Sequence, residues 1–336
     1  MKDHEERKGS IPIIRRNNME KLKCASFFAG VGGIDLGFEN TDAFEVIYAN
    51  EIDEYAVKTY EANFDIKVDN RDIYEVKADE IPDFDVMLAG FPCQAFSVAG
   101  YREGFDDRKG RGELFFELQR IFIAKKPKII FLENVKNLVG HDNGNTFRVI
   151  LNCLEDEGYH VKYKVLNAME YGNIPQTRER IYIVAFKDAE LFDRFEFPDQ
   201  IKLTKKLKDV IDFNKKQDDK YYYTEDSCGF YEQLKNEMTK TDTVYQWRRV
   251  YVRENKSNVC PTLTANMGTG GHNVPLVLTK YGIRKLTPRE CFNVQGYPKD
   301  YVLPDLANTR LYKQAGNSVV VPVIQRIAEK IAEVME

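Results

Sequence analysis

Residues 24–39 read Cys24-Ala-Ser-Phe-Phe-Ala-Gly-Val-Gly-Gly-Ile-Asp-Leu-Gly-Phe-Glu39, an apolar run followed by a glycine-rich turn and a second apolar stretch. This order predicts a strand over Cys24–Phe28, a tight turn that ends at Gly33, and a helix over Ile34–Glu39. The spacing is G-x-G-G, which differs from the dinucleotide-binding fingerprint. Eighteen residues after Gly33, Glu51 ends a second predicted strand, where a carboxylate commonly binds ribose hydroxyls. The pattern favours a nucleoside-containing cofactor over a plain strand-to-helix turn.

Short apolar runs alternate with amphipathic stretches as far as Phe186, which predicts an α/β fold with a parallel sheet flanked by helices. The predicted strands are Cys24–Phe28, Val46–Ala49, Asp85–Ala89, Ile129–Leu132, Val161–Leu166 and Ile181–Phe186. The predicted helices include Glu54–Asn63, Glu113–Lys125, Thr146–Glu157 and Val319–Val334. We also expect Asp72 and Ile73 to end a strand, where Asp72 could hold an adenine amino group. Residues 190–280 have weak helical periodicity, which predicts a smaller domain rich in strands and loops.

The chain has 336 residues, of which 43% are hydrophobic and 30% charged, as in a globular protein. No apolar stretch approaches the ~20 residues that span a bilayer, and the first residues lack the apolar core of a signal peptide. The six cysteines show no C-x-x-C pair and no disulfide-like spacing, so we expect a reducing cytoplasm. A net charge of −4 argues mildly against nucleic-acid binding, but binding depends on where the basic residues cluster.

The run Asp85-Val-Met-Leu-Ala-Gly-Phe-Pro-Cys-Gln-Ala-Phe-Ser97 places Cys93 on a proline-stiffened turn directly after a predicted strand. Open α/β sheets present reactive groups at this edge, although a single cysteine is more commonly a buried structural thiol. A nucleophilic thiolate needs helpers, and Glu133 ends another predicted strand at the same edge. The side chains of Arg178 and Arg180 would face one site if their segment is extended. Their guanidinium groups could hold a carboxylate, a phosphate or a base carbonyl; the alternative is a surface charge pair.

In their order, these motifs resemble those of the cytosine-C5 DNA methyltransferases, which use S-adenosylmethionine. The matching blocks are Phe28-Ala-Gly-Val-Gly-Gly33, Gly90-Phe-Pro-Cys-Gln-Ala-Phe-Ser97, Glu133-Asn-Val135, Gln176-Thr-Arg-Glu-Arg180, Arg284-Lys-Leu-Thr-Pro-Arg-Glu290, Gln295-Gly-Tyr-Pro298 and Gln314-Ala-Gly-Asn-Ser318. The resemblance covers nearly the whole chain. It implies a Rossmann-like methyltransferase sheet with a smaller target-recognition domain, and site-specific DNA methylation in a bacterial or phage restriction-modification system.

The resemblance also implies roles for single residues. Cys93 would add to C6 of cytosine, Glu133 would donate a proton or hydrogen bond to N3, and Arg178 and Arg180 would hold O2 and the backbone. The implied cofactor contacts are Phe28, Gly30, Gly32, Glu51, Ile52, Asp72, Ile73, Pro92, Leu114, Asn317 and Ser318. The expected DNA contacts are Gln94, Ser97, Gln246, Arg248, Arg249, Arg253, Thr262, Thr264 and Gly270. No metal is implied.

Four segments are expected: a loose tail over 1–20, a catalytic and cofactor-binding domain over 21–189 plus 310–336, a target-recognition domain over 190–280, and a bridging segment over 281–309. The target cytosine must leave the DNA stack, and we expect Ser97–Gly112 to form a loop that closes on it. Double-stranded DNA is the expected partner, with a short G- and C-containing site of the GCNGC kind. We expect a monomer in the bacterial cytoplasm, no membrane, and any restriction endonuclease on another chain.

Three other functions remain open. A tRNA cytosine methyltransferase would share the catalytic motifs, but the nearest match to its Cys-Phe-Thr signature is Cys291-Phe-Asn293, inside a different motif. A catalytically inactive DNA-binding relative would be expected to lose Cys93 or Glu133, and both are present. A dinucleotide oxidoreductase shares the sheet but does not account for the cysteine, the glutamate and the paired arginines together.

Overall fold

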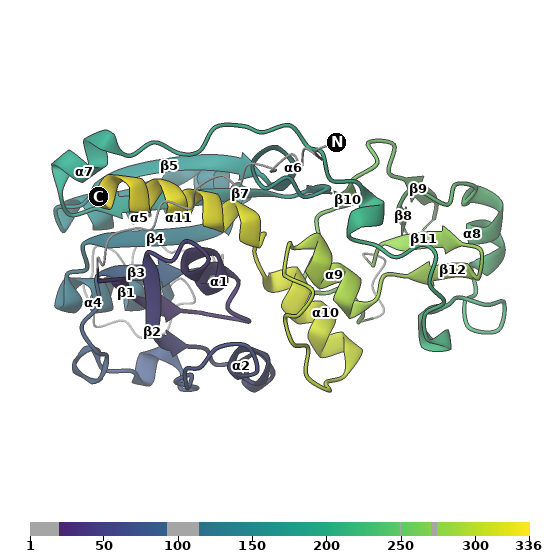
Figure 1. Cartoon of the computed structure of the whole chain (residues 1–336), viewed down its shortest axis with the longest axis horizontal. Helices are drawn as coiled ribbons and strands as arrows, with labels where there is room; N and C mark the ends of the chain where they lie inside the picture. The colour runs from purple at the N-terminus through teal and green to yellow at the C-terminus, as the bar shows by residue number, and fades with distance from the viewer. Residues whose placement is uncertain (1–19, 93–113, 249, 270–273) are drawn as a thin grey trace, which may run out of the picture.

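A computed structural model describes residues 20–92, 114–248, 250–269 and 274–336. Within these residues, a larger part is built on a six-stranded sheet and a smaller part on a four-stranded sheet, side by side (Figure 1). None of the described helices is long and apolar enough to cross a membrane. The predictions for Cys93, Gln94, Ser97, Arg249 and Gly270, for the loop over Ser97–Gly112 and for nearly all of the tail concern positions outside the described residues.

The larger sheet has the strand order β2-β1-β3-β4-β7-β5. Its strands are β1 (Leu22–Phe27), β2 (Phe44–Asn50), β3 (Val86–Ala89), β4 (Ile129–Val135), β5 (His160–Asn167) and β7 (Glu179–Phe186). The first four in spatial order run parallel, as expected, but β7 is antiparallel to both β4 and β5. The predicted parallel sheet is therefore confirmed except for β7, which runs in the opposite direction. The connection from β5 to β7 is short, and a parallel crossover needs a dozen or more residues.

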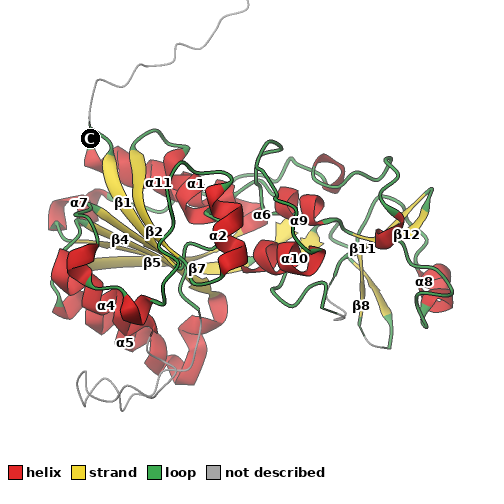
Figure 2. Cartoon of the chain, turned by 90° about the horizontal axis from the view of Figure 1, so that it is seen from below, coloured by secondary structure: helices red, strands yellow, loops and turns green. Residues whose placement is uncertain are grey.

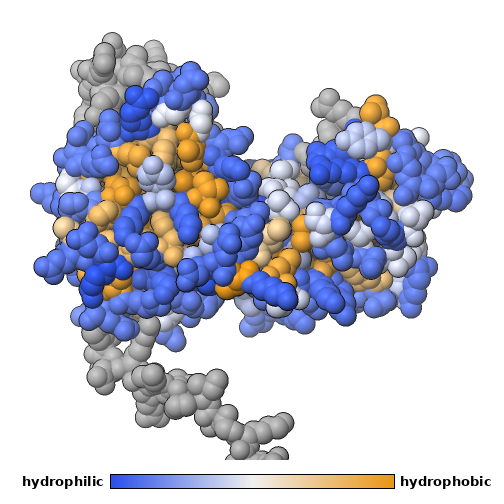
Figure 3. All heavy atoms as spheres, turned by 90° about the horizontal axis from the view of Figure 1, so that it is seen from above, coloured by the Kyte–Doolittle hydropathy of each residue, from blue (hydrophilic) through white to orange (hydrophobic). Residues whose placement is uncertain are grey.

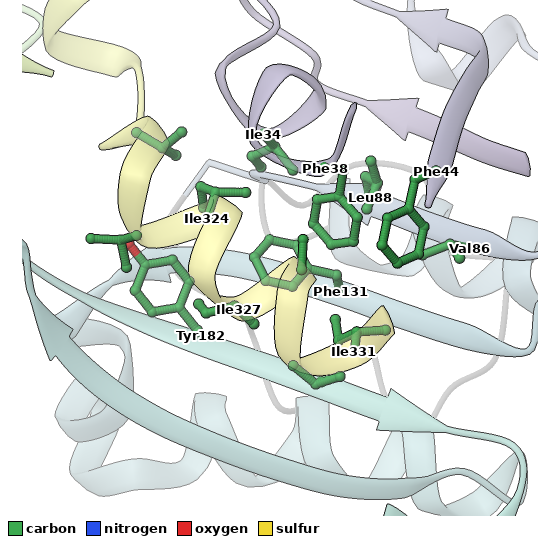
Figure 4. Close-up of a cluster of buried hydrophobic side chains, with 14 of the residues drawn as sticks. Ile34, Phe38, Phe44, Val86, Leu88, Phe131, Tyr182, Ile324, Ile327 and Ile331 are labelled. Atoms are coloured by element: carbon green, nitrogen blue, oxygen red, sulfur yellow. The ribbon is translucent and has the colours of Figure 1, made fainter. Parts of the chain in front are cut away.

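Helices cover both faces of this sheet (Figure 2). On one face lie α1 (Gly33–Glu39), α6 (Ala168–Tyr171), α7 (Ala189–Arg194) and α11 (Val321–Met335), and on the other lie α4 (Leu114–Lys125) and α5 (Asn145–Asp156). The helical spacing predicted for the C-terminus is confirmed, since Ile324, Ile327 and Ile331 of α11 are fully buried against the sheet (Figure 4). Burying each such side chain contributes about 1.5–3 kcal/mol. This packing holds the edge at which β3 and β4 end.

The smaller sheet has the order β12-β11-β8-β9 and consists of short strands. They are β8 (Tyr245–Trp247), β9 (Val252–Glu254), β11 (Leu276–Thr279) and β12 (Gly282–Lys285), beside the helix α8 (Tyr231–Glu237). Trp247 stacks on Phe230 with ring centroids 4.3 Å apart, so the single tryptophan belongs to the core of this part. Short strands and loops dominate here, as the weak helical periodicity predicted. The face in Figure 3 shows hydrophilic side chains over most of this part and patches of hydrophobic side chains on the larger one.

Three helices and two short strands lie where the parts meet: α2 (Glu54–Glu61), α9 (Pro288–Val294), α10 (Asn308–Asn317), β6 (Gln176–Thr177) and β10 (Cys260–Pro261). Strand β10 pairs in parallel with β6, and Lys313 of α10 forms an ion pair of 2.7 Å with Asp53 at the start of α2. Short 3-10 helices are η1 (Ile73–Glu75), η2 (Ala78–Glu80), η3 (Lys136–Gly144), η4 (Leu207–Asp209) and η5 (Asp219–Tyr221). The strand expected to end at Asp72 and Ile73 was wrong, because Asp72 caps η1 instead.

Candidate active site

The carboxyl ends of β3 and β4 lie side by side, with Ala89 opposite Leu132. Glu133 follows on β4 and is 8% exposed. Gly90 comes directly after the end of β3, and a Cβ placed on it would lie 3.6 Å from Oε2 of Glu133. Nδ2 of Asn134 donates a hydrogen bond of 2.8 Å to the carbonyl of Phe91. The segment Gly90–Pro92, which precedes Cys93 in the sequence, therefore begins directly beside the Glu133 carboxyl group.

Glu133 forms an ion pair with Arg180 across the antiparallel β4–β7 ladder, with Nε and Oε1 3.1 Å apart. The contact is an ion pair without hydrogen-bond geometry, and Oε1 has no hydrogen-bond partner among the described residues. Burial raises the pKa of Glu133, while the positive charges of Arg180 and Arg178 act in the opposite direction. The carboxyl group is thus buried, partly neutralised and still able to take a further hydrogen-bond partner.

Arg178 is 3% exposed and serves different partners. Its Nη1 donates to the carbonyl of Leu263 at 2.7 Å, and its Nη2 donates to the carbonyls of Gly316 at 3.1 Å and Ser318 at 2.5 Å. Nε has no hydrogen-bond partner within the described part of the chain. Burial lowers the pKa of the guanidinium, and the like charge of Arg180 lowers it further. The two arginines therefore lie near one another, but the terminal nitrogens of Arg178 are bound to main-chain carbonyls.

The glycine turn between β1 and α1 closes over the carboxylate of Glu51. Gly30 and Gly32 have φ angles of +57° and +72°, which an L side chain rarely adopts. Oε2 of Glu51 accepts from the N–H of Gly30 and Oε1 from the N–H of Asp53, each at 2.8 Å. Burial raises the pKa of Glu51, and these two N–H donors oppose that shift. The turn and the end of β2 are thereby joined into one cradle.

The other predicted cofactor contacts flank this cradle. Ile52 follows Glu51 and is 61% exposed, so an apolar side chain stands in solvent beside a half-buried carboxylate. Asp72 accepts a hydrogen bond from the N–H of Tyr74, while the side chain of Ile73 is 3% exposed and belongs to the core. Half-buried Phe28, with φ +53°, packs against the same core. Two further predicted contacts, Pro92 and Leu114, are exposed and half-buried respectively.

The end of α10 forms the opposite side of the cradle. We call Gly316-Asn317-Ser318 the C-terminal wall. Asn317 is exposed, and Oγ of Ser318 lies 2.5 Å from Oη of Tyr297. A Cβ on Gly33 would lie 2.5 Å from that tyrosine oxygen and 2.8 Å from Oγ of Ser318. The structure thus brings the predicted residue Ser318 against the glycine turn from the other end of the chain, and exposed Asn317 directly precedes it.

The predicted DNA-reading residues fall into two groups. Gln246 and Arg248 belong to the β8–β9 hairpin, where the 6% exposed glutamine accepts a hydrogen bond of 2.9 Å from Nη2 of the arginine. Arg253 is exposed on β9. Thr262 and Thr264 lie in the segment after β10, where Oγ1 of Thr262 donates to the carbonyl of Thr177 at 2.6 Å. This second group, which we call the 262–264 loop, therefore lies directly against the segment that carries Arg178.

Sequence reasoning assigned no role to Asn134, Gln176, Gln295 and Tyr297, although all four lie inside the motif blocks. All four are buried and hydrogen-bonded between elements distant in the sequence. Their position within those blocks is the sequence feature that could have indicated a role for them.

The model of the C-5 cytosine-specific DNA methylase family matches residues 22–333. The chain is 66% identical over 314 residues to the Type II methyltransferase M.Bsp6I of Bacillus sp. (strain RFL6), covering 94% of this chain and 99% of that relative. It is 39% identical over 329 residues to the Type II methyltransferase M.HhaI of Haemophilus parahaemolyticus, covering 95% and 96%. Among solved structures, the Entamoeba histolytica methyltransferase EhMeth has a TM-score of 0.72 at 20% identity, covering 95% of this chain and 100% of that one, and supports the fold. The chain belongs to the C-5 cytosine-specific DNA methylase family and is a DNA (cytosine-5-)-methyltransferase.

Proposed function

We propose that this chain methylates C5 of a flipped-out cytosine in double-stranded DNA through a covalent adduct with Cys93, with S-adenosylmethionine as methyl donor. The observation that carries the proposal is the position of Glu133. It lies paired with Arg180 and beside Gly90, so an acid, a cation and the described segment that precedes Cys93 in the sequence meet at one sheet edge. The cradle of Glu51 and the glycine turn is built from the neighbouring strands β1 and β2.

The reaction begins with the Cys93 thiolate adding to C6 of the cytosine, which breaks the C5–C6 double bond. The electron pair moves through the ring toward N3 and O2. Glu133 donates a proton or a short hydrogen bond to N3, and Arg180 stabilises the charge at O2. Arg178 is predicted from the sequence to help hold O2 and the backbone, and its contacts support the different role argued below. Once C5 carries its methyl group, loss of the C5 proton to a base allows elimination, which returns the N3 proton to Glu133 and releases Cys93 as thiolate.

The cradle fits a nucleoside-containing sulfonium cofactor. When bound, S-adenosylmethionine supplies an electrophilic methyl group to the activated C5. Glu51 would hold the ribose hydroxyls by exchanging its contact to the Gly30 N–H, and exposed Ile52 would cover the adenine. Asp72 and the main chain of Ile73 would meet the edge of the adenine. Phe28, Gly30, Gly32, Pro92, Leu114, Asn317 and Ser318 would line the remainder.

Target recognition would come from the smaller part together with the cysteine turn. Arginine side chains commonly read guanine in the major groove, which suits Arg248, Arg249 and Arg253. Gln94, Ser97, Gln246, Thr262, Thr264 and Gly270 would supply the other contacts. We propose a short site of the GCNGC kind. In a bacterial cytoplasm such methylation would protect host DNA from a restriction endonuclease on a separate chain.

Bisulfite sequencing of DNA and tRNA from cells that express the chain tests this function. We expect protected cytosines in DNA within one short sequence, and none in cells that express Cys93→Ser. Protected cytosines in tRNA alone would identify an RNA methyltransferase instead. A duplex with 5-fluorocytosine at the identified position, incubated with the cofactor, should give a protein–DNA adduct that survives denaturation. Methylation by Cys93→Ser at a rate near that of the unaltered chain would refute the covalent mechanism.

A further inference from the structure

Arg178 lies between three segments that are far apart in the chain. Its Nη1 reaches the carbonyl of Leu263 in the 262–264 loop, and its Nη2 reaches two carbonyls of the C-terminal wall. The side chain is almost completely buried, so these carbonyls replace the water that a guanidinium would otherwise bind. Hydrogen bonds from a charged donor are about twice as strong as neutral ones. Arg178 therefore ties both segments to the start of β7.

Two buried glutamines support the same connection. Oε1 of Gln176 accepts from the N–H of Leu263, and its Nε2 donates to Oε1 of Gln295 at 2.9 Å. Nε2 of Gln295 in turn donates to the carbonyl of Ala315 at 2.6 Å. Gln176 and Gln295 are both 0% exposed. Together with Arg178 they form a continuous buried polar cluster, which we call the junction.

Gly316 shows how closely the two joined segments approach. A Cβ on Gly316 would lie 2.1 Å from the carbonyl oxygen of Thr264 and 2.5 Å from the N of Ala265. Both are main-chain atoms, so a side chain at this position could be accommodated only by moving one backbone away from the other. The 262–264 loop therefore rests directly on the C-terminal wall.

The contacts continue to the glycine turn. Ser318 accepts from Arg178 through its carbonyl, and its Oγ is bonded to Tyr297, which lies against Gly33. We propose that Arg178 is a positioning residue that joins the 262–264 loop to the C-terminal wall of the cofactor site, and that it does not contact the cytosine. This inference rests on the proposed cofactor assignment.

The role predicts a specific pattern of kinetic changes. Without Arg178 the C-terminal wall loses two of the contacts that hold its carbonyls, so cofactor binding should weaken even when DNA is absent. Because Arg178 holds both the 262–264 loop and the C-terminal wall, we expect KM to rise for both DNA and cofactor. A residue that contacted only the base would lower kcat and leave cofactor binding to the DNA-free protein unchanged.

The test is calorimetric titration of S-adenosylhomocysteine into the DNA-free full chain. Arg178→Lys keeps a positive charge but cannot reach three carbonyls, and we expect its Kd to rise by about tenfold or more. Arg180→Lys, which alters the neighbouring arginine, should bind within about twofold of the unaltered chain. Gln295→Met, which removes the donor to Ala315, should also weaken binding. Because both act on the same wall, the Arg178→Lys/Gln295→Met double variant should show less than the sum of the two effects.

A control separates positioning from general destabilisation. Ile331→Ala removes a fully buried side chain far along α11 and should lower Tm at least as much as Arg178→Lys while leaving the Kd unchanged. Unchanged S-adenosylhomocysteine binding by Arg178→Lys and Gln295→Met would overturn the inference. Equal weakening by Ile331→Ala would overturn it as well. Failure of the unaltered chain to bind S-adenosylhomocysteine would instead refute the proposed cofactor, and with it the proposed function.

Discussion

Replacing Asp35 by asparagine should remove a pH-dependent weakness beneath the glycine turn. Asp35 is 0% exposed in the first turn of α1, where its Oδ1 accepts a hydrogen bond of 2.6 Å from Oγ of Ser26. Oδ2 and the hydroxyl of Tyr60 approach one another but have no well-aligned hydrogen-bond partner among the described residues. Burial raises the pKa of Asp35 from 3.8 to about 7, although Ser26 and Tyr60 oppose the shift and the charge of Glu39 adds slightly to it.

The effect of Asp35 on the free energy of unfolding at each pH follows from proton linkage. The folded state holds this proton more tightly than the unfolded state, so the stabilisation is complete below about pH 4 and is lost as pH rises through about 7. Each pH unit corresponds to about 1.4 kcal/mol, so the full effect is about 4 kcal/mol. Between pH 5 and pH 8 the free energy of unfolding should fall by about 2–3 kcal/mol on this account. The asparagine of the variant cannot ionise, and its amide could donate to the hydroxyl of Tyr60.

The measurement is urea unfolding of the unaltered chain and Asp35→Asn at pH 5, 6, 7 and 8. Far-UV circular dichroism is the suitable signal, because the single tryptophan, Trp247, lies in the smaller sheet and would report that part alone. Other titrating groups affect both proteins equally, so the difference between them isolates Asp35. We expect the variant to gain about 2–3 kcal/mol relative to the unaltered chain between pH 5 and pH 8. A difference that does not change with pH would refute the reasoning.

Three further predictions concern the site and its supports. Since burial raises the pKa of Glu133 above 4.5 and the protonated form is the donor, kcat should fall as pH rises through the raised value. In a pH–rate profile, Glu133→Gln should no longer show this fall in kcat at high pH, and its kcat should be about 10²–10⁴-fold lower. A variant that still showed the fall would contradict the assignment of Glu133 as the donor. Arg284→Met leaves the buried carboxylate of Glu290 without its cation and should cost about 3–5 kcal/mol in urea unfolding. The double variant Arg284→Met/Glu290→Met should restore only part of this, because Glu290 also accepts from the N–H groups of Asp212 and Thr287. Gly32 has a φ of +72°, and Gly32→Ala would place a Cβ 2.3 Å from the ring of Phe64. Titration of S-adenosylhomocysteine into this variant should therefore show weaker binding. Unchanged binding would show that the cofactor does not require a glycine at this turn.

Much of the fold was predictable because its determinants are local. Apolar runs of strand length, the glycine turn and the helical spacing of α11 are properties of neighbouring residues, and the described elements follow them closely. The reversed direction of β7 was missed because a strand's pattern of buried side chains is the same in either direction. The prediction that a strand ends at Asp72 was wrong for a related reason, since an aspartate can cap a helical turn as readily as it can follow a strand.

The sequence by itself determined which kinds of groups are predicted for the site: a cysteine that follows a strand, a strand-end glutamate, paired arginines and a glycine turn followed by a carboxylate. Spacing could place Arg178 and Arg180 on one side of an extended segment, but it could not assign their partners. Arg180 meets Glu133 across a ladder, while Arg178 binds carbonyls that lie 85, 138 and 140 positions away. Only the tertiary structure decided that the two arginines have different partners. A buried guanidinium donates to the acceptors that chain packing places within hydrogen-bond distance, and the local sequence around an arginine does not specify which acceptors those are.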